Sequence, residues 1–111
     1  QVADWGVIPS YYEQCSYTGI EMKMFGLPII SSNGYGVRNM FNPQNSIIAH
    51  VGKINTCEYQ HNLATAIIKA LSLPESQVEK IRQSSKRDYI KRYNIVNMFN
   101  GYFNLLSEIS K

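Results

Sequence analysis

Three short apolar segments in the first half of the chain constrain its fold more than any other feature. They span residues 5–8, 28–31 and 46–51, and each is rich in residues that favour β-strands. Short apolar runs of this kind are typical of strands buried on both faces of a sheet. A helical segment separates the first two strands, and a tight turn at 33–36 with a short helical turn at 37–41 separates the second from the third. This order predicts an α/β fold with a parallel sheet.

The helix between the first two strands is expected over about 17–25. Ser16 can cap its N-terminus, Gly26 can end it, and Pro28 prevents its continuation. Its apolar face is expected from three side chains, Ile20, Met24 and Phe25.

The second half of the chain changes to a helical period. Its first helix is indicated by apolar residues three or four apart, Leu63, Ala66, Ile67, Ala70 and Leu71. Pro74 breaks this pattern and suits the first helical position of the next helix, expected over about 75–92. Five residues of that helix are expected to face inward, Val78, Ile81, Ser85, Tyr89 and Ile90. A last helix over about 95–109 has an apolar set wider than one stripe, so more than one side should be covered.

The chain has 111 residues, which allows one small domain. Residues 1–55 would form a core of strands and helix that carries the site, and residues 56–111 the C-terminal helices. Three strands make a small parallel sheet, the first residue is not Met, and the last helix has no evident partner. We therefore expect a partial domain of a larger protein, with its strands in chain order and strand 5–8 at an open edge. That edge and the last helix would favour a homodimer of the fragment.

Composition excludes several classes of protein. Apolar residues make up 44% and charged residues 17%, which argues against a disordered chain. No apolar run approaches the ~18 residues of a membrane span, and no secretion signal is evident. The net charge of +3 is too small to indicate nucleic acid as a partner. Two cysteines are too few for a disulfide scaffold, so we expect reduced thiols and a cytoplasmic location.

The loop after the first strand leads directly into a helix N-terminus, where a ligand commonly binds in an open parallel sheet. The free N–H groups of Tyr17 and Thr18 would attract an anion, which the helix dipole also favours. Glu13 lies in the loop beside this position, and Glu21 lies about one helical turn beyond it. Because carboxylates accept hydrogen bonds well from sugar hydroxyls, a phosphate flanked by two carboxylates suggests a nucleotide-sugar.

The order of the residues also carries a resemblance to a known family. Residues 4–10 read DWGVIPS, seven residues lie between Glu13 and Glu21, residues 26–31 read GLPIIS, and Gly36 follows. This pattern resembles the C-terminal domain of retaining glycosyltransferases with the GT-B fold, most closely glycosyltransferase family 4, the group-1 type. The similarity covers nearly all of the chain. It implies a truncated, Rossmann-like parallel sheet of about three strands with flanking helices and a helical C-terminal segment.

The resemblance implies a role for each matching residue. Glu13 would be the catalytic-site residue that contacts hydroxyls of the donor sugar, and Glu21 would accept hydrogen bonds from the ribose. The N–H groups of Tyr17 and Thr18 would hold the distal phosphate, with Ser16 beside them. The reaction would retain anomeric configuration and transfer a sugar to a glycan or lipid-linked acceptor. No metal or other cofactor is expected, since His50 and His61 have no partner at a metal-ligand spacing.

Two departures from the family pattern concern the donor pocket. The family often has Gly and an aromatic residue after the first Glu, where this chain has Gln14-Cys15-Ser16, and an acidic residue where it has Asn39. In the family, the Arg and Lys for the phosphates come from the start of this domain, and the acceptor site comes from an N-terminal domain. Neither is within these residues, so this fragment alone should be inactive.

Two alternatives remain open. Six Lys and Arg side chains lie within residues 80–92. They form either a solvated helix surface or a surface that binds an anionic membrane. The second alternative would suit a protein that is peripheral at the inner face of the membrane. The wide apolar last helix could instead belong to a non-catalytic interaction module. Nucleotide binding that depends on Glu21 would separate the glycosyltransferase interpretation from both.

Overall fold

The sheet predicted from the sequence is present and parallel throughout. A computed structural model describes residues 3–12, 16–53, 56–93 and 95–110. Its three strands, β1 (Gly6–Ile8), β2 (Ile29–Ser32) and β3 (Ser46–Ala49), lie in the order β1-β2-β3. The register pairs Gly6 with Ile29 and Ile29 with Ser46. The chain is therefore an α/β fold with flanking helices, compatible with a fragment of a Rossmann-like domain.

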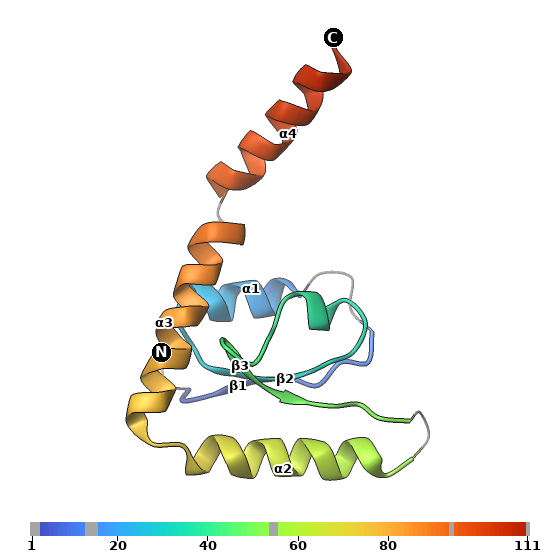
Figure 1. The fold of residues 1–111 in the computed structure, drawn as a ribbon, viewed down its shortest axis with the longest axis vertical. Helices are drawn as coiled ribbons and strands as arrows, with labels where there is room; N and C mark the ends of the chain where they lie inside the picture. The colour runs from blue at the N-terminus through green and yellow to red at the C-terminus, as the bar shows by residue number, and fades with distance from the viewer. Residues whose placement is uncertain (1–2, 13–15, 54–55, 94, 111) are drawn as a thin grey trace.

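Helices cover both faces of this sheet (Figure 1). On one face, α1 (Tyr17–Met24) and the short 3₁₀-helix η1 (Val37–Asn39) enclose a core that includes Ile8, Ile29 and Phe41. On the other face, α2 (Glu58–Ser72) packs on β3 and β2 around Ile30 and Ile47. The two apolar cores explain why β2, the central strand, is buried at all four of its positions.

Strand β1 forms one edge of the sheet, as its sequence position predicts. Its residues are not all buried, however, and Val7 is 43% exposed. Because α2 packs over β3 and β2, the face of β1 that carries Val7 extends beyond the helix. On the opposite face Gly6 lies against Met22, and a Cβ on Gly6 would come within 2.5 Å of the Met22 sulfur. The expectation of a strand buried on both faces is therefore wrong for Val7.

Helix α1 has the predicted bounds but only part of the predicted buried face. Ser16 caps it, and Gly26 follows its end with a positive φ of 68°. Met24 and Phe25, two of the three expected apolar contacts, are exposed, Phe25 by 63%. Ile20, the third, is partly buried and packs against the core as predicted, while the fully buried residues are Gly19 and Lys23. Lys23 can occupy the interior because its ammonium group is hydrogen-bonded there, which no apolar pattern indicates.

The helix after β3 is longer than its apolar repeat. Helix α2 starts at Glu58, and Ala66 and Ala70 are buried while Leu63 and Ile67 are partly buried. Leu71, the last residue of the apolar repeat, is 74% exposed.

Helix α3 (Glu75–Asp88) continues into a π-helical turn, Tyr89–Tyr93. Pro74 was expected at the first helical position, but it is the N-cap, the residue immediately before the helix. Val78, Ile81 and Ser85 are buried as predicted, but Tyr89 is only half-buried and Ile90 is exposed. A π-turn has more residues per turn than an α-helix, so it rotates the side chains after Asp88 away from the α-helical pattern.

Helix α4 (Ile95–Ile109) projects away from the sheet (Figure 1). Its side chains from Val96 to Ile109 are exposed. The wide apolar set predicted that more than one side of this helix would be covered, but no described residue covers it. None of the helices, over the residues described, combines the length and apolarity needed to cross a bilayer.

Candidate functional site

The N-terminus of α1 points toward the end of the sheet at which the parallel strands finish (Figure 1). The Ser16 hydroxyl accepts a hydrogen bond from the Gly19 N–H at 3.0 Å, as expected of an N-cap. The N–H groups of Tyr17 and Thr18, in the first turn, have no acceptor among the residues that the structure describes. Such groups and the helix dipole together attract an anion.

Glu21 lies on the same face of α1 as Thr18, three residues away. Both line a pocket of about 360 Å³ together with Met22, Phe25 and Leu27. The structure therefore brings two of the predicted site residues to one concave surface, which runs along α1 from Thr18 to Phe25. Glu13, the predicted catalytic residue, lies outside the described residues.

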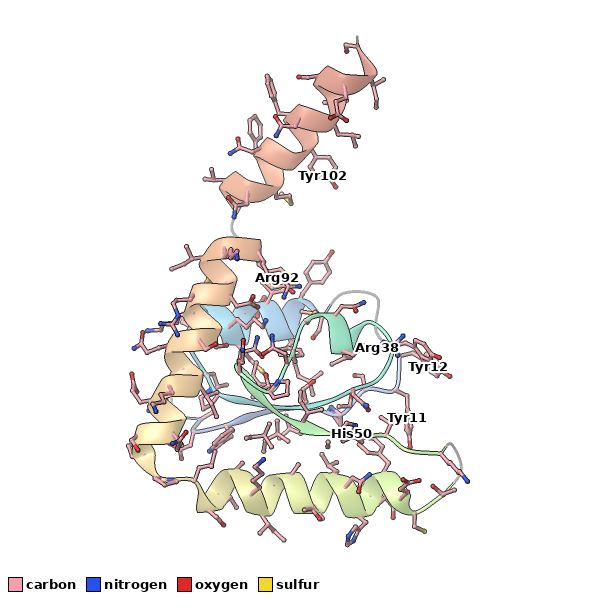
Figure 2. The ribbon with its side chains drawn as sticks, in the orientation of Figure 1. Tyr11, Tyr12, Arg38, His50, Arg92 and Tyr102 are labelled. Carbon is pink, nitrogen blue, oxygen red and sulfur yellow. The ribbon has the colours of Figure 1, made fainter. Side chains whose placement is uncertain are left out.

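A second pocket, of about 450 Å³, lies where the three strands end (Figure 2). Each strand is followed by part of its lining, which consists of Tyr11, Tyr12, Asn33, Gly34, Tyr35, Arg38, His50, Val51 and Gly52. Gly34 is required here, since a Cβ at this position would lie 2.4 Å from the Tyr11 carbonyl oxygen. Crevices at this edge of an open parallel sheet are where such folds bind ligands.

Three side chains of this pocket form a stack. The rings of Tyr12 and Tyr35 lie parallel, with centroids 5.6 Å apart and an interplanar angle of 6°. The Arg38 guanidinium lies 4.5 Å from the centroid of Tyr35. The ring supports the guanidinium by a cation–π contact, and Arg38 is an exposed residue of the pocket lining.

Hydrogen bonds fix the proton position on His50, on the β3 side of the pocket. The Asn33 side-chain oxygen accepts from the Val51 N–H at 2.8 Å, so the Asn33 amide nitrogen must face His50. That nitrogen lies 2.8 Å from His50 Nδ1. Because an amide nitrogen only donates, Nδ1 is the acceptor and the neutral ring carries its proton on Nε2.

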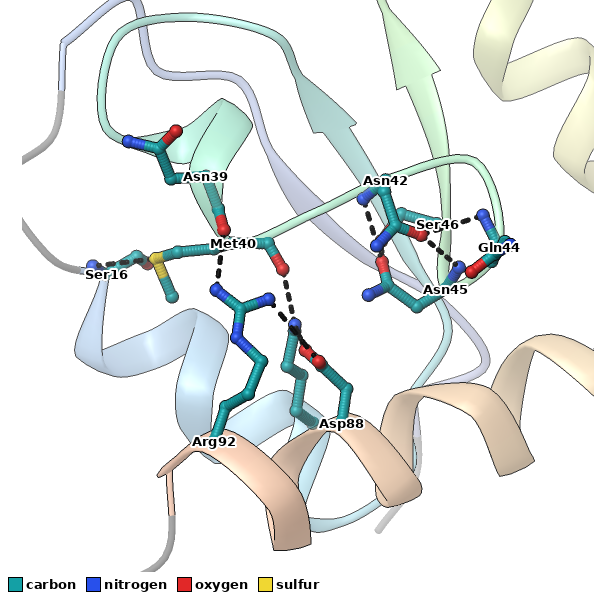
Figure 3. Close-up of polar contacts among 10 residues, drawn as sticks. Ser16, Asn39, Met40, Asn42, Gln44, Asn45, Ser46, Asp88 and Arg92 are labelled. Carbon is teal, nitrogen blue, oxygen red and sulfur yellow. Dashed lines mark hydrogen bonds and ion pairs between the residues drawn. The ribbon is translucent and has the colours of Figure 1, made fainter. Parts of the chain in front are cut away.

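A buried ionic network supports the loop that carries Arg38 (Figure 3). Lys23, which has no exposed surface, donates to the Met40 carbonyl and pairs with Asp88. Arg92 also pairs with Asp88 and donates to the Asn39 carbonyl at 2.8 Å. Burial lowers the pKa of Lys23, while the hydrogen bond to Asp88 acts in the opposite direction. The network fastens α3 to the segment immediately after Arg38.

Sequence reasoning missed Arg38, the tyrosine stack and Lys23. Gly34 and Gly36 marked a turn at this position, but nothing in the local pattern indicated that Arg38 would meet residues from the other two strand ends. His50 directly follows β3 and His61 lies on the surface of α2, as their positions predict. Within the described residues, no three His, Cys, Asp or Glu side chains gather as a metal site would require.

The basic residues of α3 are largely exposed. Arg82 pairs with Glu75 at 2.8 Å and with Glu79 at 3.2 Å. Lys80 and Arg87 are exposed and form no ion pair with a described residue. The cluster is thus partly neutralised along its own helix.

A scan against protein-family models finds no match to the chain, and a search of curated proteins finds none.

Proposed function

We propose that the chain is the donor-binding part of a retaining glycosyltransferase of the GT-B type, similar to glycosyltransferase family 4. One observation carries the proposal. Two backbone N–H groups without a described acceptor, at Tyr17 and Thr18, begin a helix at the carboxyl end of a parallel sheet. The Glu21 carboxylate stands one turn further along the same face, beside a pocket.

The proposed ligand is a nucleotide-sugar, and each part of it has a partner. The distal phosphate accepts hydrogen bonds from the N–H groups of Tyr17 and Thr18, and Ser16 holds the first turn in place for this. The ribose hydroxyls donate to Glu21, which is exposed and free to accept. Glu13, by the family resemblance, contacts hydroxyls of the donor sugar near the reacting carbon.

The parent enzyme would transfer the sugar, with retention, to a glycan or lipid-linked acceptor. The family resemblance assigns the acceptor site to an N-terminal domain and the basic phosphate ligands to the start of this domain. The open edge of β1 is compatible with a sheet that continues in a longer chain. The proposed location is cytoplasmic or at the inner face of the membrane, where such acceptors are glycosylated.

A thermal-shift titration with UDP, GDP and ADP tests the proposal. At a ligand concentration ten times a Kd of about 1 mM, linkage stabilises the chain by about 1.4 kcal/mol. For a domain of this size that raises the unfolding midpoint by roughly 5 °C. We expect a rise with one nucleotide and its loss in Glu21→Ala.

The matched control is Glu108→Ala, which removes an exposed carboxylate from α4, far from the proposed site. Both variants remove one negative charge, so the net charge changes equally. Because Glu108 is far from the proposed site, its variant should keep the nucleotide-dependent rise. A rise that survives in Glu21→Ala would contradict the proposed ribose contact. No rise with any nucleotide, repeated on a longer chain that includes the basic phosphate ligands, would contradict the proposed function.

A second candidate function is binding to an anionic membrane surface. It is favoured by the exposed basic side chains without a described ion pair, such as Lys80 and Arg87, and by the exposed apolar helix α4. Co-sedimentation with vesicles that contain anionic lipid would test it, with neutral vesicles as the control. Binding that falls steeply with salt while nucleotides have no effect would favour this function over the first.

A further inference from the structure

We propose that the pocket at the strand ends selects a donor whose sugar carries a carboxylate, such as a hexuronic acid, and that Arg38 recognises that carboxylate. This inference rests on the proposed function, because it assigns the sugar of the same nucleotide-sugar donor. The pocket of about 450 Å³ has room for a sugar ring.

The charge of the pocket favours an anion. Arg38 is exposed and forms no ion pair with a described carboxylate. No Asp or Glu is among the residues that line the pocket in the described part of the chain. His50 adds an N–H donor at Nε2, because Asn33 occupies its Nδ1. The two donors, the Arg38 guanidinium and the His50 Nε2–H, thus follow two different strands, and no carboxylate of the pocket lining accepts from them.

The geometry of Arg38 favours a carboxylate in particular. A guanidinium presents parallel N–H donors that match the two oxygens of a carboxylate. The contact with Tyr35, which is itself stacked on Tyr12, restrains the position of the guanidinium beside the pocket. A preorganised side chain loses less conformational entropy when it binds, so the contact discriminates more strongly.

The aromatic lining favours a sugar rather than a bare anion. Tyr11, Tyr12 and Tyr35 line the pocket, and all three are exposed. The ring of Tyr11, and the face of the Tyr12 ring that Tyr35 does not cover, can pack against the C–H faces of a pyranose, and the tyrosine hydroxyls can bond to its hydroxyls. The phosphate has its own place at the start of α1. Tyr12 and Ser16 are four positions apart in the chain, so their Cα atoms are at most about 14 Å apart and one donor can reach both.

The test compares glucuronic acid 1-phosphate with glucose 1-phosphate, which differ at one carbon and need no choice of base. Binding is followed by amide chemical shifts of the ¹⁵N-labelled chain. We expect the acid to bind about tenfold more tightly, as one charge-assisted contact provides. Arg38→Gln should remove this preference, and the shifts in the wild type should include residues that flank the pocket. The control Arg87→Gln, which removes an exposed arginine of α3, should retain the preference.

Each other outcome overturns the proposal. Equal affinities of the wild type for the two sugar phosphates, or a preference that survives in Arg38→Gln, would exclude Arg38 as the selective contact. Binding of neither sugar phosphate, repeated on the longer chain that includes the basic phosphate ligands, would exclude the pocket as a sugar site. If nucleotides still bind with dependence on Glu21, these results overturn the sugar assignment alone. If nucleotides also fail to bind the longer chain, both the sugar assignment and the proposed function are overturned.

Discussion

Lys23 is a buried charge whose ion-pair partner is Asp88. Its ammonium group is fully inside and hydrogen-bonds to Asp88 and to the Met40 carbonyl. Removing one partner of a buried pair leaves an uncompensated charge, which costs about 3–5 kcal/mol. We predict that Asp88→Asn lowers the free energy of unfolding by about 3 kcal/mol, measured by urea denaturation, and that Lys23→Met lowers it by less.

The order of these two variants is the critical result. In Lys23→Met the Asp88 carboxylate still pairs with Arg92 and remains partly exposed. The loss of the ammonium group therefore costs less free energy of unfolding than the loss of the carboxylate. If Asp88→Asn were as stable as the wild type, the pair would not hold α3 to the loop after Arg38.

Tyr59 gives a prediction with a pH dependence. Its hydroxyl donates to the Pro9 carbonyl at 2.8 Å, and burial raises its pKa above the ordinary 10.0. The folded state therefore keeps this proton at a pH at which the unfolded state has lost it, so stability falls as pH rises above 10.0. Urea denaturation at a series of alkaline pH values should show a smaller decrease for Tyr59→Phe than for the wild type. Parallel curves would contradict this.

Ser85 tests the opposite situation, a buried hydroxyl without a partner. Its oxygen is inaccessible and has no hydrogen-bond partner among the described residues. An unsatisfied buried polar group costs about 1–3 kcal/mol, so its removal should not destabilise the protein. We predict that Ser85→Ala has a midpoint of thermal unfolding equal to or above that of the wild type. A lower midpoint would show that the hydroxyl does have a partner.

At the scale of elements, hydrophobic period predicted which segments are helices and strands but not always which side is buried. The bounds of α1 and α4 agree with the sequence because Ser16, Gly26 and the apolar set mark them. The prediction for the buried face of α1 was right for Ile20 but missed Lys23, whose partner Asp88 lies sixty-five residues away. Such a partner cannot be inferred from local spacing.

In the candidate site too, local features could be predicted from the sequence and contacts between distant segments could not. A helix N-terminus after a strand is a local feature, so Ser16, Tyr17, Thr18 and Glu21 could be proposed from the sequence alone. The pocket that contains Arg38 is not local, because its lining follows three different strands. Only the parallel register brings those strand ends together.

Helix α4 should make the isolated chain self-associate. Its exposed apolar side chains include Phe99 and Phe103, whose rings stack with centroids 6.5 Å apart. Large exposed apolar surfaces promote association. We predict that sedimentation velocity detects a dimer or larger species at high concentration, and that Phe99→Asp with Phe103→Asp shifts the chain toward monomer. A wild-type chain that stays monomeric would contradict the prediction.

At the scale of the whole molecule, helices cover both faces of a three-stranded sheet while the edge at β1 and the length of α4 stay uncovered by described residues. The proposed site lies at the carboxyl end of this sheet, and α3 lies at the other end (Figure 1). The ionic network through Lys23 connects α3 to the loop that carries Arg38. Stability and the proposed binding should therefore be separable at Glu21, which is exposed, but coupled at Asp88.

The central claim is that a nucleotide phosphate binds at the start of α1. The most direct measurement is the amide spectrum of the ¹⁵N-labelled chain during titration with UDP, GDP and ADP. The account predicts that the amides of Tyr17 and Thr18 move most, because their N–H groups donate to the phosphate. Shifts confined to the exposed basic residues of α3, such as Lys80 and Arg87, would contradict it, since they would show charge attraction without the proposed site.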